Sequence, residues 1–481
     1  MRGLKQEFPL PNGERARVRG VKAVSLEPGE EWKGEDVSVG DVLNALNEIR
    51  RKFALAEASD AEHPQPRNCV MTLVAVGDSE ADERRAQLAT RAIGATHPAQ
   101  IVVITDKPEQ HPGRIDATIT TDILRPESTC ALQCEVVTLR VRGTAGEHLA
   151  ALVDPLLPSG VPTYLWWVAT PPFGKHELND ALKICDSLIV DSARFDAPYH
   201  SFLELAELAT NSHQKLGVAD LQWARLEPWL ETVAQFFAPA ARRPFLKGIT
   251  EVGIDYAGEG RGNRIAAALL IGWMASALGW KLQKAAGGNG GVVAAHFTAE
   301  GWHPIQVAFR SVPKAHLAQG EVSAIRIGGV SAGTTFNLSV LRDPERPRRP
   351  SPDIGAGGYQ SLHAAGGEDD AGFELAQRKV AWHHDVLQES AGNLHHTATG
   401  DAPGESLPKK PAVFVRERRR DDNSLVLLTL IDIGGANTLR HVQQMEPEDE
   451  ASLLLDLLAH PTRDHVFTRS LVAAAELMRS I

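Results

Sequence analysis

The sequence predicts an α/β protein with two sheet domains, and three observations lead to this fold class. Between residues 67 and 248, short apolar runs alternate with helical patterns, which indicates a Rossmann-like, mostly parallel sheet. From residue 249 onward the apolar runs follow one another at hairpin-like spacing around one helix, which indicates an α+β domain with a largely antiparallel sheet. The length of 481 residues favours two or three domains.

The elements of the first part follow from local patterns. Residues 1–66 are expected to form an N-terminal arm and a helix at 38–55, whose apolar side chains recur at helical spacing after a candidate N-cap, Ser38. Within the α/β domain at 67–248, strands are expected at 70–76, 101–104, 135–141, 161–168 and 187–190. Helices are expected at 78–93, 143–157, 177–184, 200–216 and 220–237.

The second domain, at 249–481, combines strands with few helices. Its strands are expected at 250–256, 292–297, 305–312, 325–329, 335–341, 413–416 and 425–433. Its helices are expected at 265–280, 447–460 and 463–478. From about 343 to 411 the composition is rich in Pro, Gly, His and acidic residues, which indicates a mobile excursion from the domain.

Composition and charge exclude several classes of function. A net charge of −11 and an isoelectric point near 5.9 argue against nucleic-acid binding, which needs a concentrated basic surface. The first residues lack the apolar segment of a secretory signal, and four cysteines fit a reducing cytosol, so we expect a cytoplasmic protein. The apolar helix at 265–280 has 16 residues without a charge, whereas a membrane span needs roughly 20, so we expect a buried helix and no membrane.

Known catalytic and cofactor motifs are missing from the sequence. It contains no GxxxxGK[ST] loop, no GxGxxG after a strand and no HExxH. The glycine cluster at 287–291 follows a helix and precedes a strand, the reverse of the order that aims backbone N–H groups at a phosphate. The histidine pairs at 383–384 and 395–396 lack the spacing of a metal site. We therefore expect no catalytic residues, no metal and no cofactor.

Two pairs of residues leave alternatives open. Cys130 and Cys134 lie four positions apart, so their thiols can meet if the segment is a helical turn that ends where the strand begins. They are either a redox-active pair or inert, buried thiols. Trp166 and Trp167 end a predicted strand and should face opposite sides of the sheet. They either pack in the core or, at the carboxyl end of the strand, take part in binding.

The segment DLQWARLEPWLETVAQFF, at 220–237, holds the main candidates for a partner surface. One row of its apolar side chains has helical spacing and is typical of a core. Arg225, Trp229 and Phe236 lie outside that row, and Trp and Arg dominate the energetics of many protein interfaces. These three residues either lock neighbouring helices together or contact a partner protein.

Pro228 is expected to set the start of this helix. It lacks an N–H donor and its ring crowds the preceding turn, so the helix should begin near residue 227, after a short turn capped by Asp220. In the structural alternative, Arg225 caps the carbonyl groups at this break and bridges to Asp220.

The same segment resembles the signature of the OpcA family, the assembly or effector proteins of glucose-6-phosphate dehydrogenase. Further stretches occur in the order of that family: VMTLVAV, HPAQIVVI, CEVVTLRVRG, LLPSGVPTYLWW, SLIVDSARF, GWMASALGW and EPEDEASLLLDLLAHPTRDHVFTRSL. The resemblance covers residues 37–342 and 412–478. It implies a non-catalytic protein that binds glucose-6-phosphate dehydrogenase, promotes its assembly or activates it allosterically, and so controls the oxidative pentose phosphate pathway.

Two other functions compete with this one. The sheet topology and the tryptophan pair at 166–167 are also compatible with an enzyme that acts on a sugar phosphate or nucleotide at the strand ends of the α/β domain. The third is a scaffold that stabilises dehydrogenase oligomers without changing their rates.

Overall fold

The structure of the chain is a computed structural model that divides into two compact units, each with an eight-stranded sheet. It describes residues 26–58, 69–94, 99–124, 132–211, 216–258, 262–287, 292–301, 303–314, 317–342, 425–435, 438–445, 449–459 and 464–481. Unit 1 takes its described residues from Met1–Pro239, Asn263–Trp280 and Glu448–Ser480. Unit 2 takes its described residues from Ala240–Gly262 and Lys281–Pro447, together with Ile481.

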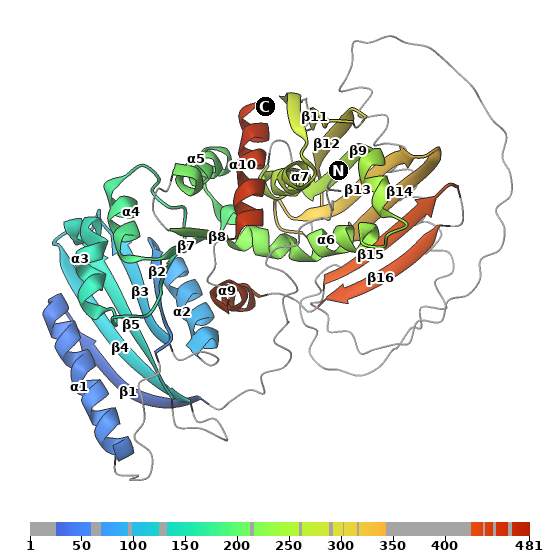
Figure 1. Cartoon of the computed structure of the whole chain (residues 1–481). Helices are drawn as coiled ribbons and strands as arrows, with labels where there is room; N and C mark the ends of the chain where they lie inside the picture. The colour runs from blue at the N-terminus through green and yellow to red at the C-terminus, as the bar shows by residue number, and fades with distance from the viewer. Residues whose placement is uncertain are drawn as a thin grey trace. The chain divides into compact units, whose positions relative to one another are not determined.

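The sheet of unit 1 is mostly parallel and has the strand order β1-β4-β5-β3-β2-β6-β7-β8 (Figure 1). The strands are β1 (Leu26–Gly34), β2 (Met71–Gly77), β3 (Ala99–Lys107), β4 (Arg114–Leu124), β5 (Leu132–Arg142), β6 (Thr163–Trp167), β7 (Ser187–Val190) and β8 (Gly217–Asp220). β4 runs antiparallel to both β1 and β5, and the pairs from β5 to β8 are parallel.

Helices cover both faces of this sheet. The described helices of unit 1 are α1 (Val39–Ala58), α2 (Glu80–Gly94), α3 (Leu149–Val153), α4 (His176–Ala181), α5 (Pro198–Asn211), α6 (Leu221–Phe237), α7 (Ile265–Leu278), α9 (Glu450–Ala459) and α10 (His465–Arg479). Figure 1 shows α1, α3 and α4 on one face and α2 and α9 on the other. On the first face, Arg50 of α1 binds Glu135 of β5, and the Gln100 amide donates to the carbonyl of Leu156.

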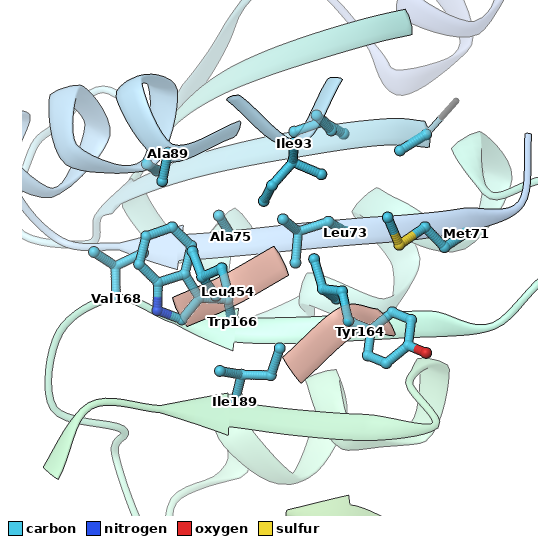
Figure 2. Close-up of a cluster of buried hydrophobic side chains, with 14 of the residues drawn as sticks. Met71, Leu73, Ala75, Ala89, Ile93, Tyr164, Trp166, Val168, Ile189 and Leu454 are labelled. Carbon is cyan, nitrogen blue, oxygen red and sulfur yellow. The ribbon is translucent and has the colours of Figure 1, made fainter. Parts of the chain in front are cut away.

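The core beneath α2 and α9 is apolar and continuous (Figure 2). Because the central strands are covered on both faces, they are runs of apolar residues with little alternation, as in β2, where all seven residues are buried. Trp166 of β6 is fully buried there, and Leu454 of α9 packs in the same cluster. Leucines from the end of the chain thereby complete the core of the first sheet.

The sheet of unit 2 has the strand order β10-β11-β12-β9-β13-β14-β15-β16. The strands are β9 (Ile249–Ala257), β10 (Lys281–Gly287), β11 (Val293–Thr298), β12 (Ile305–Val312), β13 (Val322–Ser331), β14 (Thr334–Arg342), β15 (Leu425–Ile433) and β16 (Leu439–Met445). Among the described strands of this second sheet, only β9 and β12 pair in parallel. The predicted fold class, with one mostly parallel and one largely antiparallel sheet, is confirmed.

The division into units groups three helices with the first sheet. α7, α9 and α10 belong to unit 1, whereas the predicted boundaries place them in the domain at 249–481. α7 is buried on nearly all sides, and its Gly272 lies against Ser470 and Ala474 of α10, where a Cβ atom would come within 2.2 Å of the Ser470 carbonyl oxygen. Among the described residues, no helix has both the length and the apolarity to cross a membrane.

Several predicted elements differ from the structure. The single helix expected at 143–157 is split into 3-10 turns, at Gly143–His148 and Asp154–Leu156, on either side of the five-residue α3. Strands β1, β4, β8, β10 and β16 were missed, although β4 alternates apolar and polar residues clearly. The excursion expected at 343–411, the strand at 413–416 and both histidine pairs lie outside the described residues.

The predicted start of α6 is wrong. The helix runs unbroken from Leu221 to Phe237, with Pro228 inside it. Asp220 is the N-cap as expected, since its side chain accepts a hydrogen bond from the Gln222 N–H. Pro228 leaves only the Ala224 carbonyl without its helical donor, and burial of the helix on several sides outweighs this local cost.

Candidate functional site

A cluster of charged residues lies at the carboxyl ends of the parallel strands in unit 1. Asp191 directly follows β7, and Asp220 is the last residue of β8. Arg225 projects from the second turn of α6, and Arg85 from α2. Open α/β sheets bind ligands at this edge. The geometry of the cluster therefore decides whether its charged side chains are available to a ligand.

Two arginines share the carboxylate of Asp191. Arg225 is bidentate, with Nη1 at 2.6 Å from Oδ1 and Nη2 at 3.0 Å from Oδ2. Arg85 Nη2 donates to the same Oδ2 at 2.9 Å, and Arg85 Nη1 donates to the Val168 carbonyl at 2.9 Å. Planar guanidinium groups match a carboxylate well, so this arrangement joins β7 to both helices.

Arg85 also links α9 to the sheet. Its Nε donates to Glu450 Oε2 at 2.6 Å, and its Nη2 contacts the other oxygen of that carboxylate. The guanidinium carbon lies 5.6 Å from the ring centroid of Trp166, a cation–π geometry. One arginine therefore connects α2, the end of β6, Asp191 and the first turn of α9.

Asp191 and Arg225 stay charged at neutral pH. Burial raises the pKa of Asp191, but Arg225 and then Arg85 outweigh burial and hold that pKa below its usual value. Burial lowers the pKa of Arg225, and the charge of Asp191 more than offsets it. The guanidinium and carboxylate groups bond mainly to one another. The cluster is therefore better suited to holding the helices and strand ends in place than to transferring protons.

Asp220 is buried and bonds to Ser192 and Gln222, not to the arginines of the cluster. Its Oδ1 accepts hydrogen bonds from the N–H groups of Ser192 and Gln222, and its Oδ2 accepts from the Ser192 hydroxyl at 2.5 Å. Complete burial raises its pKa to about 6 despite these donors. The predicted bridge from Arg225 to Asp220 is wrong, because the bidentate partner of Arg225 is Asp191.

The aromatic candidates for partner contact are buried. The exposed fractions of Trp166, Trp167, Trp229 and Phe236 are 0%, 7%, 3% and 3%. The side chain of Arg225 is 29% exposed, so among these five residues it alone reaches the surface. A direct role of the five in partner binding stays a prediction, while their positions favour packing.

The cysteine prediction is corrected in part. Cys134 lies in β5, not at the end of a helical turn, and its Sγ is 3.4 Å from the Ala99 carbonyl oxygen. Burial raises the pKa of the Cys134 thiol to about 12, the reverse of what a reactive thiol needs. Cys130 lies outside the described residues. Redox activity of this pair stays a prediction.

Sequence reasoning missed three members of the cluster. Asp191 could have been found, because an acidic residue directly after a buried strand lies at the ligand-binding edge of such a sheet. Arg85 and Glu450 are 365 positions apart, and nothing in their local sequences distinguishes them from other charged helix residues. In the described part of the chain, no three His, Cys, Asp or Glu residues are grouped so as to hold a metal.

Two family models match this chain. The first is described as the glucose-6-phosphate dehydrogenase subunit N-terminal domain and matches residues 90–207. The second is described as the C-terminal domain of the same subunit and matches residues 216–471, more than half of the chain. The chain belongs to the OpcA family. The resemblance seen in the sequence motifs is therefore confirmed.

Curated relatives carry the provisional name OxPP cycle protein OpcA. The protein from a Synechocystis species is 25% identical over 75% of this chain and 75% of its own length. Those from Nostoc punctiforme and Synechococcus elongatus are each 29% identical, over 52% and 50% of this chain. The chain spans about half the length of these last two, 51% and 54%. The printed name thus associates these relatives with the OxPP cycle.

Solved structures are only distantly similar. An oxidoreductase from Sinorhizobium meliloti is 12% identical, with 58% of this chain and 75% of that chain covered and a TM-score of 0.33. An oxidoreductase from Bacillus cereus is 10% identical, with 85% and 97% covered and a TM-score of 0.29. At these TM-scores, neither the fold nor the activity of those proteins bears on this chain.

Proposed function

We propose that this OpcA family member is a non-catalytic cytoplasmic protein that binds glucose-6-phosphate dehydrogenase. It promotes assembly of the enzyme or activates it allosterically, and so controls the oxidative pentose phosphate pathway. The observation that carries the proposal is the match to two models, both described as domains of a subunit of this dehydrogenase.

The geometry at the strand ends supports a binding role over turnover. Arg85, Arg225 and Asp191 are committed to one another, and α9 lies over the apolar core beside them. A catalytic site needs a group held within reach of substrate with its proton or lone pair available. In the described part of this edge, the charged side chains instead hold the helices and the strand ends in fixed positions, as a protein-binding surface requires.

An activating partner must distinguish between states of its target. It shifts the dehydrogenase only if it binds the active arrangement more tightly than the inactive one. A partner that binds both arrangements equally stabilises a complex and leaves the rates unchanged. Kinetics and assembly therefore have to be measured together.

The test combines size-exclusion chromatography with steady-state kinetics. Purified protein and dehydrogenase from the same organism should elute together, and saturating protein should change the KM or kcat at fixed enzyme concentration. Co-elution with unchanged rates but more stable dehydrogenase oligomers at high dilution would establish the assembly role alone. Separate elution together with unaltered kinetics would refute the proposal.

The competing reading is an enzyme acting on a sugar phosphate or nucleotide. It is favoured by the position of the charged cluster at the carboxyl ends of β6, β7 and β8. The isolated protein, incubated with sugar phosphates or nucleotides and without dehydrogenase, is the matched control for the experiment above. Turnover there would support the enzyme, and its absence alongside complex formation would exclude it.

A further inference from the structure

Among the described strands, four lie at the edges of the two sheets: β1 and β8 in unit 1, and β10 and β16 in unit 2 (Figure 1). An edge strand presents a row of backbone N–H and C=O groups to any further strand. Folded proteins therefore protect their sheet edges with proline, lysine, an irregular register, a very short strand or a cover. The four edges of this chain differ in this protection.

Three of the four edges have such features. β1 contains Pro28, and its register with β4 shifts between Pro28 and Glu31. β8 has only four residues, and three of them are buried. β10 carries Lys281 and Lys284, both exposed, and its register with β11 shifts between Leu282 and Lys284. Each of these strands is a poor template for a further strand.

β16 has none of these features. Its seven residues, Leu439–Met445, include no proline and no lysine, and they pair with β15 in an uninterrupted register. The four residues at 439–442 are all exposed, and two of them are apolar: Leu439 is 64% exposed and Val442 is 41% exposed. Arg440 is the one residue of the strand with a permanent charge. A regular edge with exposed apolar side chains is where a strand from another chain adds most readily.

An apolar row leads from the interior of the second sheet to this edge. Ala324 of β13 lies opposite Leu341 of β14, and both are buried in one apolar cluster. Leu341 lies opposite Leu428 of β15, which packs partly buried against the same cluster. Leu428 in turn lies opposite Val442, where the row ends at the exposed edge. A further apolar side chain beside Val442 would continue the row and remove Val442 from water.

The sequence of β16 suits pairing with a second copy of itself. In a symmetric antiparallel pair, directly opposite residues point to the same face of the sheet, so the two-fold axis passes through one residue. Val442 is the midpoint of β16, and an axis there pairs the strand over its whole length. The resulting pairs are Val442 with Val442, His441 with Gln443, Arg440 with Gln444, and Leu439 with Met445. Apolar residues meet apolar residues, and no like charges lie opposite each other.

We propose that β16 pairs antiparallel with β16 of a second copy of this chain, around a two-fold axis through Val442. The pairing joins two eight-stranded sheets into one continuous sheet and extends the apolar row across the axis. Backbone hydrogen bonds supply the attraction, and the alternation of side chains fixes the register. The inference does not depend on the proposed binding of a dehydrogenase, because it concerns the isolated protein.

Sedimentation equilibrium of the full chain tests the dimer. The wild type should have twice the 52.0 kDa mass of the chain. Val442→Lys places two like charges opposite each other on the axis, so it should raise the dissociation constant of the dimer by roughly tenfold or more. Ala286→Lys adds the same charge at an exposed position of the edge strand β10, so it is the matched control and should leave the dimer unchanged. Circular dichroism establishes that each variant is folded.

Cysteine cross-linking tests the register of the two strands. Opposite residues in an antiparallel pair have Cα atoms about 4.5–5.5 Å apart, which is within the range of a disulfide. Val442→Cys should therefore form a covalent dimer under mild oxidation. Leu439→Cys should not, because the two copies of residue 439 lie about 20 Å apart along the paired strands. The wild-type chain under the same conditions controls for the native cysteines.

Two results of these experiments would overturn the proposal. The first is a wild-type chain that stays monomeric at every concentration, even where Val442→Lys abolishes a complex with the dehydrogenase, since β16 would then take a strand of that partner. The second is a dimer that Val442→Lys weakens no more than Ala286→Lys does, or that cross-links at residue 439 and not at residue 442, since its interface or register would then be a different one.

Discussion

Among single residues, Asp106 is the clearest case of an acid in an unfavourable position. It lies near the end of β3, and its Oδ1 is buried without a hydrogen-bond partner in the described part of the chain. The backbone of Gly146 approaches it so closely that a Cβ atom there would lie 2.0 Å from Oδ1. Burial, followed by the charges of Glu109, Glu177 and Glu147, raises the pKa of Asp106 to about 6.

Asp106→Asn should therefore stabilise the protein at neutral and alkaline pH. Because the pKa is higher in the folded state, Asp106 contributes stability below about pH 4, and this contribution is lost as the pH rises through about 6. Asparagine stays neutral, so at pH 8 the variant should gain about 1 kcal/mol once solvent screening is allowed for. Urea unfolding at pH 4 and pH 8 measures the difference.

The control for this experiment is Glu204→Gln, an exposed position of α5. It should leave the unfolding midpoint unchanged at both pH values, because exposed substitutions have small effects. If Asp106→Asn and the wild type unfolded at the same urea concentration at pH 8, the unfavourable position of Asp106 would be disproved.

At the scale of the element, α6 shows how tertiary packing overrides a local signal. Pro228 predicts a break, yet Leu221, Leu226, Leu230 and their neighbours are buried along a continuous helix. A proline inside a helix costs about 3 kcal/mol, through the lost hydrogen bond and the clash of its ring, whereas each buried large apolar side chain contributes about 1.5–3 kcal/mol. The helix therefore continues through the proline.

Trp229→Ala separates the two roles that the sequence left open for α6. Trp229 is 3% exposed, so we expect its removal to lower the free energy of unfolding by about 3–5 kcal/mol. Leu88→Ala, on α2 and 73% exposed, is the control and should change stability by less than about 0.5 kcal/mol. Normal stability of Trp229→Ala with lost dehydrogenase binding would identify a partner surface instead.

At the scale of the whole molecule, unit 1 depends on the last part of the chain. α9 and α10 come after the strands of unit 2, yet both belong to unit 1. The Asp464 side chain caps α10 and also accepts a hydrogen bond from Trp223 Nε1 of α6 at 3.2 Å. The large buried apolar side chains they add are Leu453, Leu454, Leu458, Phe467, Leu471, Leu477 and Met478.

A chain that ends at residue 447 should consequently fail to fold unit 1. Each of these side chains contributes about 1.5–3 kcal/mol, and together they contribute an amount similar to the roughly 5–15 kcal/mol that stabilises a typical domain. Loss of the cooperative unfolding transition, followed by tryptophan fluorescence, is the expected result. A control that ends at Ser480 should unfold like the full chain, and an unchanged transition in the shorter chain would contradict the dependence.

The candidate site was only partly predictable. Arg225 was identified because arginine is unusual beside an apolar helical row, but its partner Asp191 lies 34 residues earlier and was overlooked. Arg85 and Glu450 gave no signal, because they lie 365 positions apart and their pairing depends on folding to bring α2 and α9 together. Burial of Trp166, Trp167 and Trp229 likewise depends on contacts that form only in the folded chain.

The fold class, most strands and helices, and the OpcA family follow from the sequence alone, because apolar periodicity and ordered motifs are local properties. The pairing of the charged side chains, the course of α6 through Pro228, the place of α9 in the first core and the grouping of α7 and α10 with unit 1 follow from the tertiary structure alone. Those outcomes depend on contacts between residues hundreds of positions apart, such as Arg85 and Glu450, whose energy arises only when folding removes them from water.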